Sequence, residues 1–150
     1  MTKSINLLKY HQMKFSIKVQ YGLQAMLALS LNYGGGQVQI KDIAAEQKIP
    51  IRFLEQLLLI LKRAGLVSSI RGKHGGYLLG KKPSEITLLN VIEALEGPLE
   101  LANKKMKKTP IIFEAFAKVQ SDLTAQLTRV TLAELTLRAR QKDLALTYSI

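Results

Sequence analysis

The chain has 150 residues, 47% of them hydrophobic, and its 22 basic and 11 acidic side chains give a net charge of +11. These values indicate one folded domain with an appendage and exclude a disordered chain. The absence of cysteine excludes disulfides and thiolate metal sites, and the absence of a long apolar run predicts no transmembrane helix, so a cytoplasmic protein is expected. The positive charge favours a polyanionic partner, either a nucleic acid or an anionic membrane surface.

The first helix is expected after a short N-terminal extension. Residues 1–12 contain too few apolar side chains for a secretory signal, and they are expected to form a mobile tail or a short helix packed on the domain, with the tail favoured. A helix is predicted over residues 17–32, with Ser16 as its N-cap. Its apolar residues cover a wide arc, which places it at the centre of the fold. Lys18 and Tyr21 lie near its start.

A helix-turn-helix is predicted next. After a glycine-rich loop, Val38 and Ile40 alternate with polar residues and indicate a small strand. A second helix is predicted over residues 41–48, and the segment 47–50 turns into a third. Residues 50–64 form this third helix, whose leucines recur at helical spacing and form one buried stripe. Its long polar residues fall on the other side: Arg52, Glu55, Gln56 and Arg63.

A glycine-tipped hairpin follows the third helix. Gly65 can end the helix in the left-handed conformation, and strands are predicted over residues 67–71 and 77–79. Arg71, Lys73 and His74 lie at or beside the turn between them. A helix with such a polar front can enter the major groove of DNA, and the hairpin can reach the phosphates or the minor groove. The alternative is a solvated helix face and an ordinary hairpin.

After the hairpin, the sequence predicts a helix, a loop and a second, longer helix. Thr87 can cap a helix over residues 88–96, and a lysine-rich loop follows over residues 99–109. A long helix is predicted from Pro110 to Thr128. One side of this helix is a continuous apolar seam. Such a seam indicates contact with a partner, and packing against the same chain is the alternative. The seam residues are Ile112, Phe116, Val119, Leu123 and Leu127.

Three segments resemble the signature of the Rrf-two family of bacterial winged-helix transcription regulators. They are residues 53–56 (FLEQ), 64–67 (AGLV) and 69–79 (SIRGKHGGYLL), and the similarity runs from Met13 to Leu99 and more loosely to Leu135. The resemblance implies a mainly α fold with a small β-wing. It implies a winged helix-turn-helix domain over residues 13–98, then the Lys-rich loop over 99–109, and a dimerisation helix with a C-terminal tail over 110–150. Residues 131–135 resemble a short family helix, and no pattern is evident after Arg138.

The resemblance also implies a function and a set of site residues. We expect a sequence-specific, DNA-binding regulator that acts as a homodimer on double-stranded DNA, with an effector, small molecule or protein, that the sequence does not identify. The predicted dimer contacts are the seam residues of the long helix. The predicted DNA-binding residues are Lys18, Tyr21, Arg52, Glu55, Gln56, Arg63, Arg71, Lys73 and His74.

One branch of that family holds an iron–sulfur cluster with three cysteines in the segment that corresponds to residues 99–109. Here the segment carries four lysines and no cysteine, so no cluster and no other cofactor is expected. The lysines are interpreted as a solvated loop, with contacts to flanking DNA or to an anionic effector as alternatives.

Enzyme chemistry has little support in the sequence. The histidines, His11 and His74, belong to no cluster with ligand or catalytic spacing, and the glycine-rich turn leads into a strand rather than into the helix of a phosphate loop. The protein is therefore expected not to be an enzyme. A second hypothesis from another class is an adaptor whose winged helix contacts protein and whose long helix docks a partner enzyme. The joint presence of Arg52, Gln56, Arg71 and Lys73 favours DNA binding.

Overall fold

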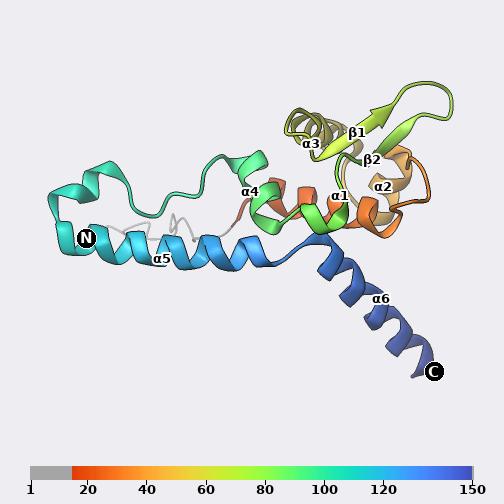
Figure 1. Cartoon of the computed structure of the whole chain (residues 1–150). Helices are drawn as coiled ribbons and strands as arrows, with labels where there is room; N and C mark the ends of the chain where they lie inside the picture. The colour runs from red at the N-terminus through yellow and green to blue at the C-terminus, as the bar shows by residue number, and fades with distance from the viewer. Residues whose placement is uncertain (1–14, 150) are drawn as a thin grey trace, which may run out of the picture.

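The computed structural model describes residues 15–149, so the expected N-terminal extension lies outside the described residues. It shows a small helical head with a two-stranded wing, from which the helices labelled α5 and α6 extend in different directions (Figure 1). The helices are α1 (Ile17–Leu31), α2 (Ile40–Gln47), α3 (Ile51–Arg63), α4 (Leu88–Glu96), α5 (Pro110–Arg129) and α6 (Leu132–Tyr148), the strands are β1 (Val67–Ile70) and β2 (Gly76–Leu79), and short 3-10 turns span Pro83–Glu85 and Lys104–Lys108. The predicted fold class, mainly α with a small β-wing, is confirmed. Among the described helices, none is both long and apolar enough to cross a membrane.

The core of the head forms where α1, α3 and α4 meet. The leucine stripe of α3 is fully buried, and Met26 of α1 is buried beside it. Gly22 lets α4 approach α1 closely, because a Cβ at this position would collide with the side chain of Leu95. Burial of these apolar side chains supplies most of the driving force that holds the three helices together.

The end of α3 is set by its own sequence. Gly65 has φ +76, the amide of Gly65 donates to the carbonyl of Lys62 at 2.9 Å, and the amide of Leu66 donates to the carbonyl of Leu61 at 3.0 Å. These two bonds form a Schellman motif, which satisfies carbonyls that the helix would otherwise leave unpaired. The chain then turns directly into β1, so the helix and the wing are held in a fixed relation.

The wing is an antiparallel hairpin with register Val67↔Leu79 to Ile70↔Gly76. Val38 joins it through one isolated bridge to Tyr77, with both backbone N–H···O bonds at 2.8 Å. The extended segment predicted at Val38 is therefore present, as a single bridge to the wing. The prediction for Ile40 is wrong, since this residue begins α2: Gln39 is the N-cap, so the chain is already helical two residues after the bridge.

The second correction concerns α6, which the sequence predicted as a short helix over residues 131–135. The helix continues to Tyr148. The hydroxyl of Thr131 caps its start by accepting from the amide of Glu134 at 3.2 Å, and Arg138 pairs with Glu134 one turn along. No glycine or proline interrupts residues 132–148, so the helix has no local stop signal.

Ser16 also differs in part from the prediction. It stands at the N-cap position of α1, yet its side chain makes no cap hydrogen bond to the helix. The hydroxyl instead donates to the carboxylate of Glu96 at the end of α4. Thr87, by contrast, caps α4 as predicted, since it accepts from the amide of Asn90 while the Asn90 side chain accepts from the amide of Thr87.

Candidate nucleic-acid interface

The outer face of α3 is polar and exposed. Arg52, Glu55, Gln56 and Arg63 are all exposed there, while the leucine stripe on the opposite side is buried. With 3.6 residues per turn, these four positions lie along one side of the helix. The helix therefore presents long hydrogen-bonding side chains to the outside as a single row.

Leu59 lies in the middle of that row, and the sequence reasoning did not select it. Its side chain is 48% exposed. It stands three residues after Gln56 and four before Arg63, which places it between them on the helix surface. The sequence contains a signal for this exposure, because Leu59 does not fall at the helical spacing of the buried leucines 54, 57, 58 and 61.

The neighbouring helices hold α3 from behind. The ring of Tyr21 in α1 meets the ring of Phe53 edge-on, with centroids 5.7 Å apart and planes at 73°. Lys18 and Tyr21 are half-buried at this end of α1 rather than fully exposed.

The turn between α2 and α3 passes through Lys48 in the left-handed conformation, with φ 54, and the amide of Ile49 donates to the carbonyl of Ala44 at 3.0 Å. This is the helix-turn-helix that the sequence predicted.

The tip of the wing carries exposed basic residues on a defined backbone. Arg71, Lys73 and His74 are exposed. The Gln37 side-chain amide donates to the carbonyl of His74 at 2.7 Å, and the amide of Gly75 donates to the carbonyl of Gly72 at 3.0 Å. These bonds hold the tip in place, so its charges project from a formed loop.

A hollow of about 420 Å³ separates the wing tip from the start of α2. Arg71 and Lys73 line one side of it, and Lys41 lines the other. Lys41 is a further basic residue that the sequence reasoning did not select, because its place beside the wing depends on the bridge between Val38 and Tyr77. Gly76 allows this approach, since a Cβ there would lie 2.5 Å from the carbonyl oxygen of Val38.

Within the described residues, no ion pair neutralises the basic charges on this side. In the part of the chain from 15 to 149, the side-chain ion pairs are Lys118–Asp122 in α5 and Arg138–Glu134 in α6. The basic side chains of α3 and the wing therefore remain available to an anion. One polar helix face and one basic loop beside it match the geometry by which winged helices contact a groove and its phosphates.

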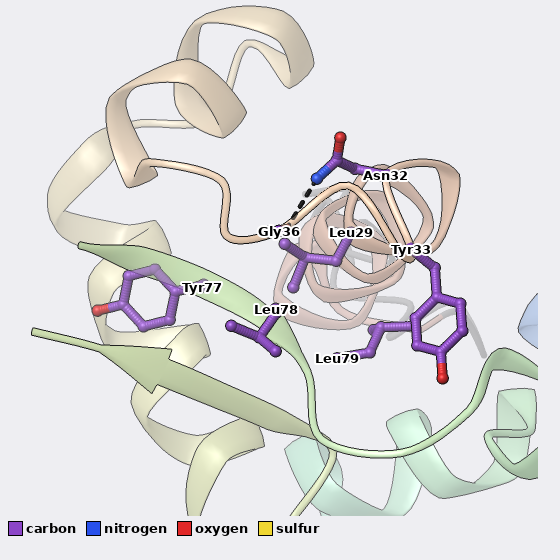
Figure 2. A pocket seen from close by; sticks show the side chains of 8 residues that line it. Leu29, Asn32, Tyr33, Gly36, Tyr77, Leu78 and Leu79 are labelled. Carbon is purple, nitrogen blue, oxygen red and sulfur yellow. Dashed lines mark hydrogen bonds between the residues drawn. The ribbon is translucent and has the colours of Figure 1, made fainter. Parts of the chain in front are cut away.

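A second hollow of about 320 Å³ lies between the end of α1 and β2 (Figure 2). Leu29, Tyr33 and Leu79 line it, together with Tyr77 and Leu78. Its lining includes no charged side chain, so its chemistry differs from that of a phosphate site.

The apolar seam of α5 is exposed along its outer part. Ile112 is 48% exposed, Phe116 42% and Val119 55%, and Leu123 is half-buried. The structure places Leu127 differently, since it packs against the protein's own core. Figure 1 shows why: α5 reaches the head only at its C-terminal end.

Comparison with known proteins identifies the relatives of this chain. The family model described as Rrf2, iron-dependent transcriptional regulator, matches residues 15–138. The HTH-type transcriptional regulator CymR of Bacillus subtilis is 37% identical over 123 residues, which cover 82% of this chain and 89% of that protein. The HTH-type transcriptional regulator IscR of Escherichia coli is 38% identical over 129 residues, covering 82% of this chain and 80% of that protein.

Solved structures agree with these sequence relatives. The structure of CymR, the global cysteine regulator of B. subtilis, superimposes with a TM-score of 0.77 at 36% identity and covers 84% of this chain and 98% of that one. The structure of IscR from T. potens gives a TM-score of 0.71 at 37% identity, with 85% and 89% covered.

The family model is described as iron-dependent, but the donor atoms of this chain do not suit an iron site. The chain has no cysteine, and across residues 15–149 no group of three His, Cys, Asp or Glu side chains is placed to hold a metal ion. The segment before α5 instead carries Lys104, Lys105, Lys107 and Lys108, whose charges repel a cation. An iron–sulfur cluster is held chiefly by thiolates, and this chain offers none.

Proposed function

The chain belongs to the Rrf2 family of transcriptional regulators, and we propose that it acts as a homodimer that binds double-stranded operator DNA sequence-specifically and carries no iron–sulfur cluster. Its relatives are transcriptional regulators rather than enzymes, which agrees with the expectation that it has no catalytic activity. The observation that carries the proposal is the exposed polar row of α3 beside a basic wing whose charges form no ion pair with any residue from 15 to 149.

In this proposal the front of α3 reads base edges in the major groove. Arg52 suits the two acceptors of guanine, and Gln56 suits the acceptor and donor of adenine. Glu55 is repelled by phosphate, so it needs the amino group of a cytosine or a bridging arginine. Arg63, at the far end of the row, is assigned to the DNA backbone.

The wing and the start of α1 position the protein on the duplex. Arg71, Lys73 and His74 are proposed to meet phosphates or the minor groove. Lys18 and Tyr21 are proposed to meet the backbone beside α3, from the end of α1 that supports Phe53. Such contacts supply affinity rather than sequence preference, and they make binding sensitive to salt.

The proposed dimer forms through the outer part of α5. Ile112, Phe116, Val119 and Leu123 make one stripe that the head does not cover. Exposed apolar stripes of this kind mark interaction sites, and a second copy supplies the same stripe. Leu127, also predicted as part of the seam, is half-buried and packs against the protein's own core, so it is proposed to support the base of α5.

The test of DNA recognition is selection of bound genomic fragments by the purified full-length chain at physiological salt. Enrichment of a near-palindromic sequence is expected, with half-sites about one helical turn, or 34–36 Å, apart. A control selection with the Arg52→Ala and Gln56→Ala double variant should lose that enrichment. If no sequence is enriched by the unmodified protein, the proposal of an operator-binding regulator is wrong and the adaptor hypothesis gains support.

The test of the cluster assignment is independent of DNA. Protein purified anaerobically should be colourless and should contain no stoichiometric iron. A stoichiometric cluster absorbance would overturn this part of the proposal and would leave the DNA-binding part standing.

A further inference from the structure

We propose that Leu59 determines specificity by packing against the 5-methyl group of a thymine in each half-site. This inference rests on the proposed function, since it assigns a role to one more residue of the α3 row. The observation behind it is an apolar side chain, 48% exposed, inside an otherwise polar row.

The position of Leu59 puts it at the same surface as the proposed base readers. It follows Gln56 by three residues and precedes Arg63 by four, and both of these side chains are exposed. Residues at these spacings are neighbours on a helix surface. When α3 enters a groove with Gln56 facing the bases, Leu59 is therefore enclosed by the same groove.

The chemistry of a leucine narrows what it can contact there. Its side chain neither donates nor accepts hydrogen bonds. Among the groups that base pairs present in the major groove, the apolar one is the C5 methyl of thymine. Packing Leu59 against an amino group or a purine edge would remove water from that edge and return no hydrogen bond, which is unfavourable. The enclosed leucine therefore selects thymine.

The contact also explains how an apolar residue is tolerated on this face. About half of the Leu59 side chain is in water in the free protein. Covering it with a methyl group removes apolar surface of both partners from water, so the contact contributes to binding as well as to preference.

The experiment uses an operator obtained by the fragment selection and replaces its thymines one at a time with deoxyuridine, which removes only the methyl group. Dissociation constants are measured by fluorescence anisotropy with the full-length chain. At one thymine in each half-site, the substitution should weaken binding about fourfold per half-site, as expected for one buried methyl. In the Leu59→Ala variant, that penalty should disappear at this thymine, and the effect of deoxyuridine at every other thymine should be the same as in the unmodified protein.

Ile70→Ala is the matched control. Ile70 is also 48% exposed, but it lies at the end of β1 rather than on α3. This variant should retain the deoxyuridine penalty. Leu59→Ala should keep its fold, because it removes exposed atoms and alanine favours helix, and an unchanged thermal melt will show this.

The outcomes separate this inference from the function on which it rests. If deoxyuridine weakens binding equally in the unmodified protein and in Leu59→Ala at every thymine, Leu59 does not read a methyl group and the inference is wrong. The same holds if no thymine of the operator is sensitive. If no operator can be selected at all, the failure lies with the proposed function.

Discussion

The side-chain oxygens of Ser30 in α1 and Thr136 in α6 lie 2.6 Å apart, and both residues are buried. This hydrogen bond joins two helices through residues that are 106 positions apart in the chain. Nearby, the Arg140 guanidinium donates to the carbonyl of Leu31 at 3.2 Å. Together these contacts attach α6 to the C-terminal end of α1, which is one of the helices that support α3.

We predict that Thr136→Val will destabilise the protein by about 1–3 kcal/mol, because it leaves the buried hydroxyl of Ser30 without a partner. Urea unfolding at one fixed protein concentration measures the change. Thr147→Val is the control, since the hydroxyl of Thr147 is exposed and bonds only to a carbonyl of its own helix. Equal effects of the two substitutions would show that the Ser30–Thr136 bond contributes little. The Ser30→Ala and Thr136→Val double variant should lose less stability than the sum of the single variants.

For base reading, we predict that Gln56→Ala will relax preference at one or two operator positions. A good bidentate contact typically carries about 1–3 kcal/mol of discrimination. Competition binding with operators changed at single base pairs measures this. Gln141→Ala, an exposed glutamine in α6, should leave the preference unchanged. Equal weakening on all sequences would remove Gln56 from the set of base-reading residues.

The wing should act through charge. We predict that Arg71→Ala and Lys73→Ala will each weaken binding across all sequences and flatten the salt dependence by roughly one unit of slope per lost phosphate contact. Titrations at several salt concentrations measure the slope. Lys142→Ala, which removes an exposed charge from α6, should leave the slope unchanged if α6 stays away from the DNA. If the slope of the salt dependence is unchanged in the wing variants, the wing does not contact the phosphates and remains in solvent.

The dimer prediction concerns Phe116. We predict that Phe116→Lys will give monomers, because it places a charge in an apolar contact that a second copy would have to desolvate. Sedimentation measures the assembly state, and the monomers should bind one half-site at close to non-specific affinity. Ile111→Lys is the matched control: Ile111 is 82% exposed and does not belong to the stripe, so dimers should persist. A monomeric unmodified protein with full operator affinity would contradict the dimer.

Much of the fold could be predicted from the sequence because its signals are local. The end of α3 depends on Gly65 and the two amides that follow the last turn, and the start of α4 depends on Thr87 and Asn90. The leucine stripe of α3 separates its buried and exposed faces by spacing alone. The polar row of the candidate site follows from the same spacing, so helical periodicity is sufficient to identify its exposed residues.

Other features depend on contacts between distant segments, and spacing says nothing about these. Lys41 lies beside the wing only because Val38 pairs with Tyr77. The hydroxyl of Ser16 bonds Glu96 rather than its own helix because α4 ends next to the start of α1. The length of α6 could not be predicted because its residues show no simple apolar stripe, and its place is set by the bond to Ser30.

The order of the elements, the polar face of α3, the basic wing tip and the lack of thiolate ligands all follow from the amino-acid sequence alone. Which residues of the α5 seam are exposed and which pack against the head depends instead on tertiary contacts. The amide of Leu88 donates to the carbonyl of Val130, and the amide of Leu132 donates to the carbonyl of Ile86, both at 2.9 Å. These bonds anchor the junction of α5 and α6 to the head. Leu127 consequently is half-buried and packs against the protein's own core, while Phe116 remains exposed. The same helical spacing places both residues on one side of α5, but the head contacts only the C-terminal end of α5, so Leu127 is partly covered and Phe116 is left exposed.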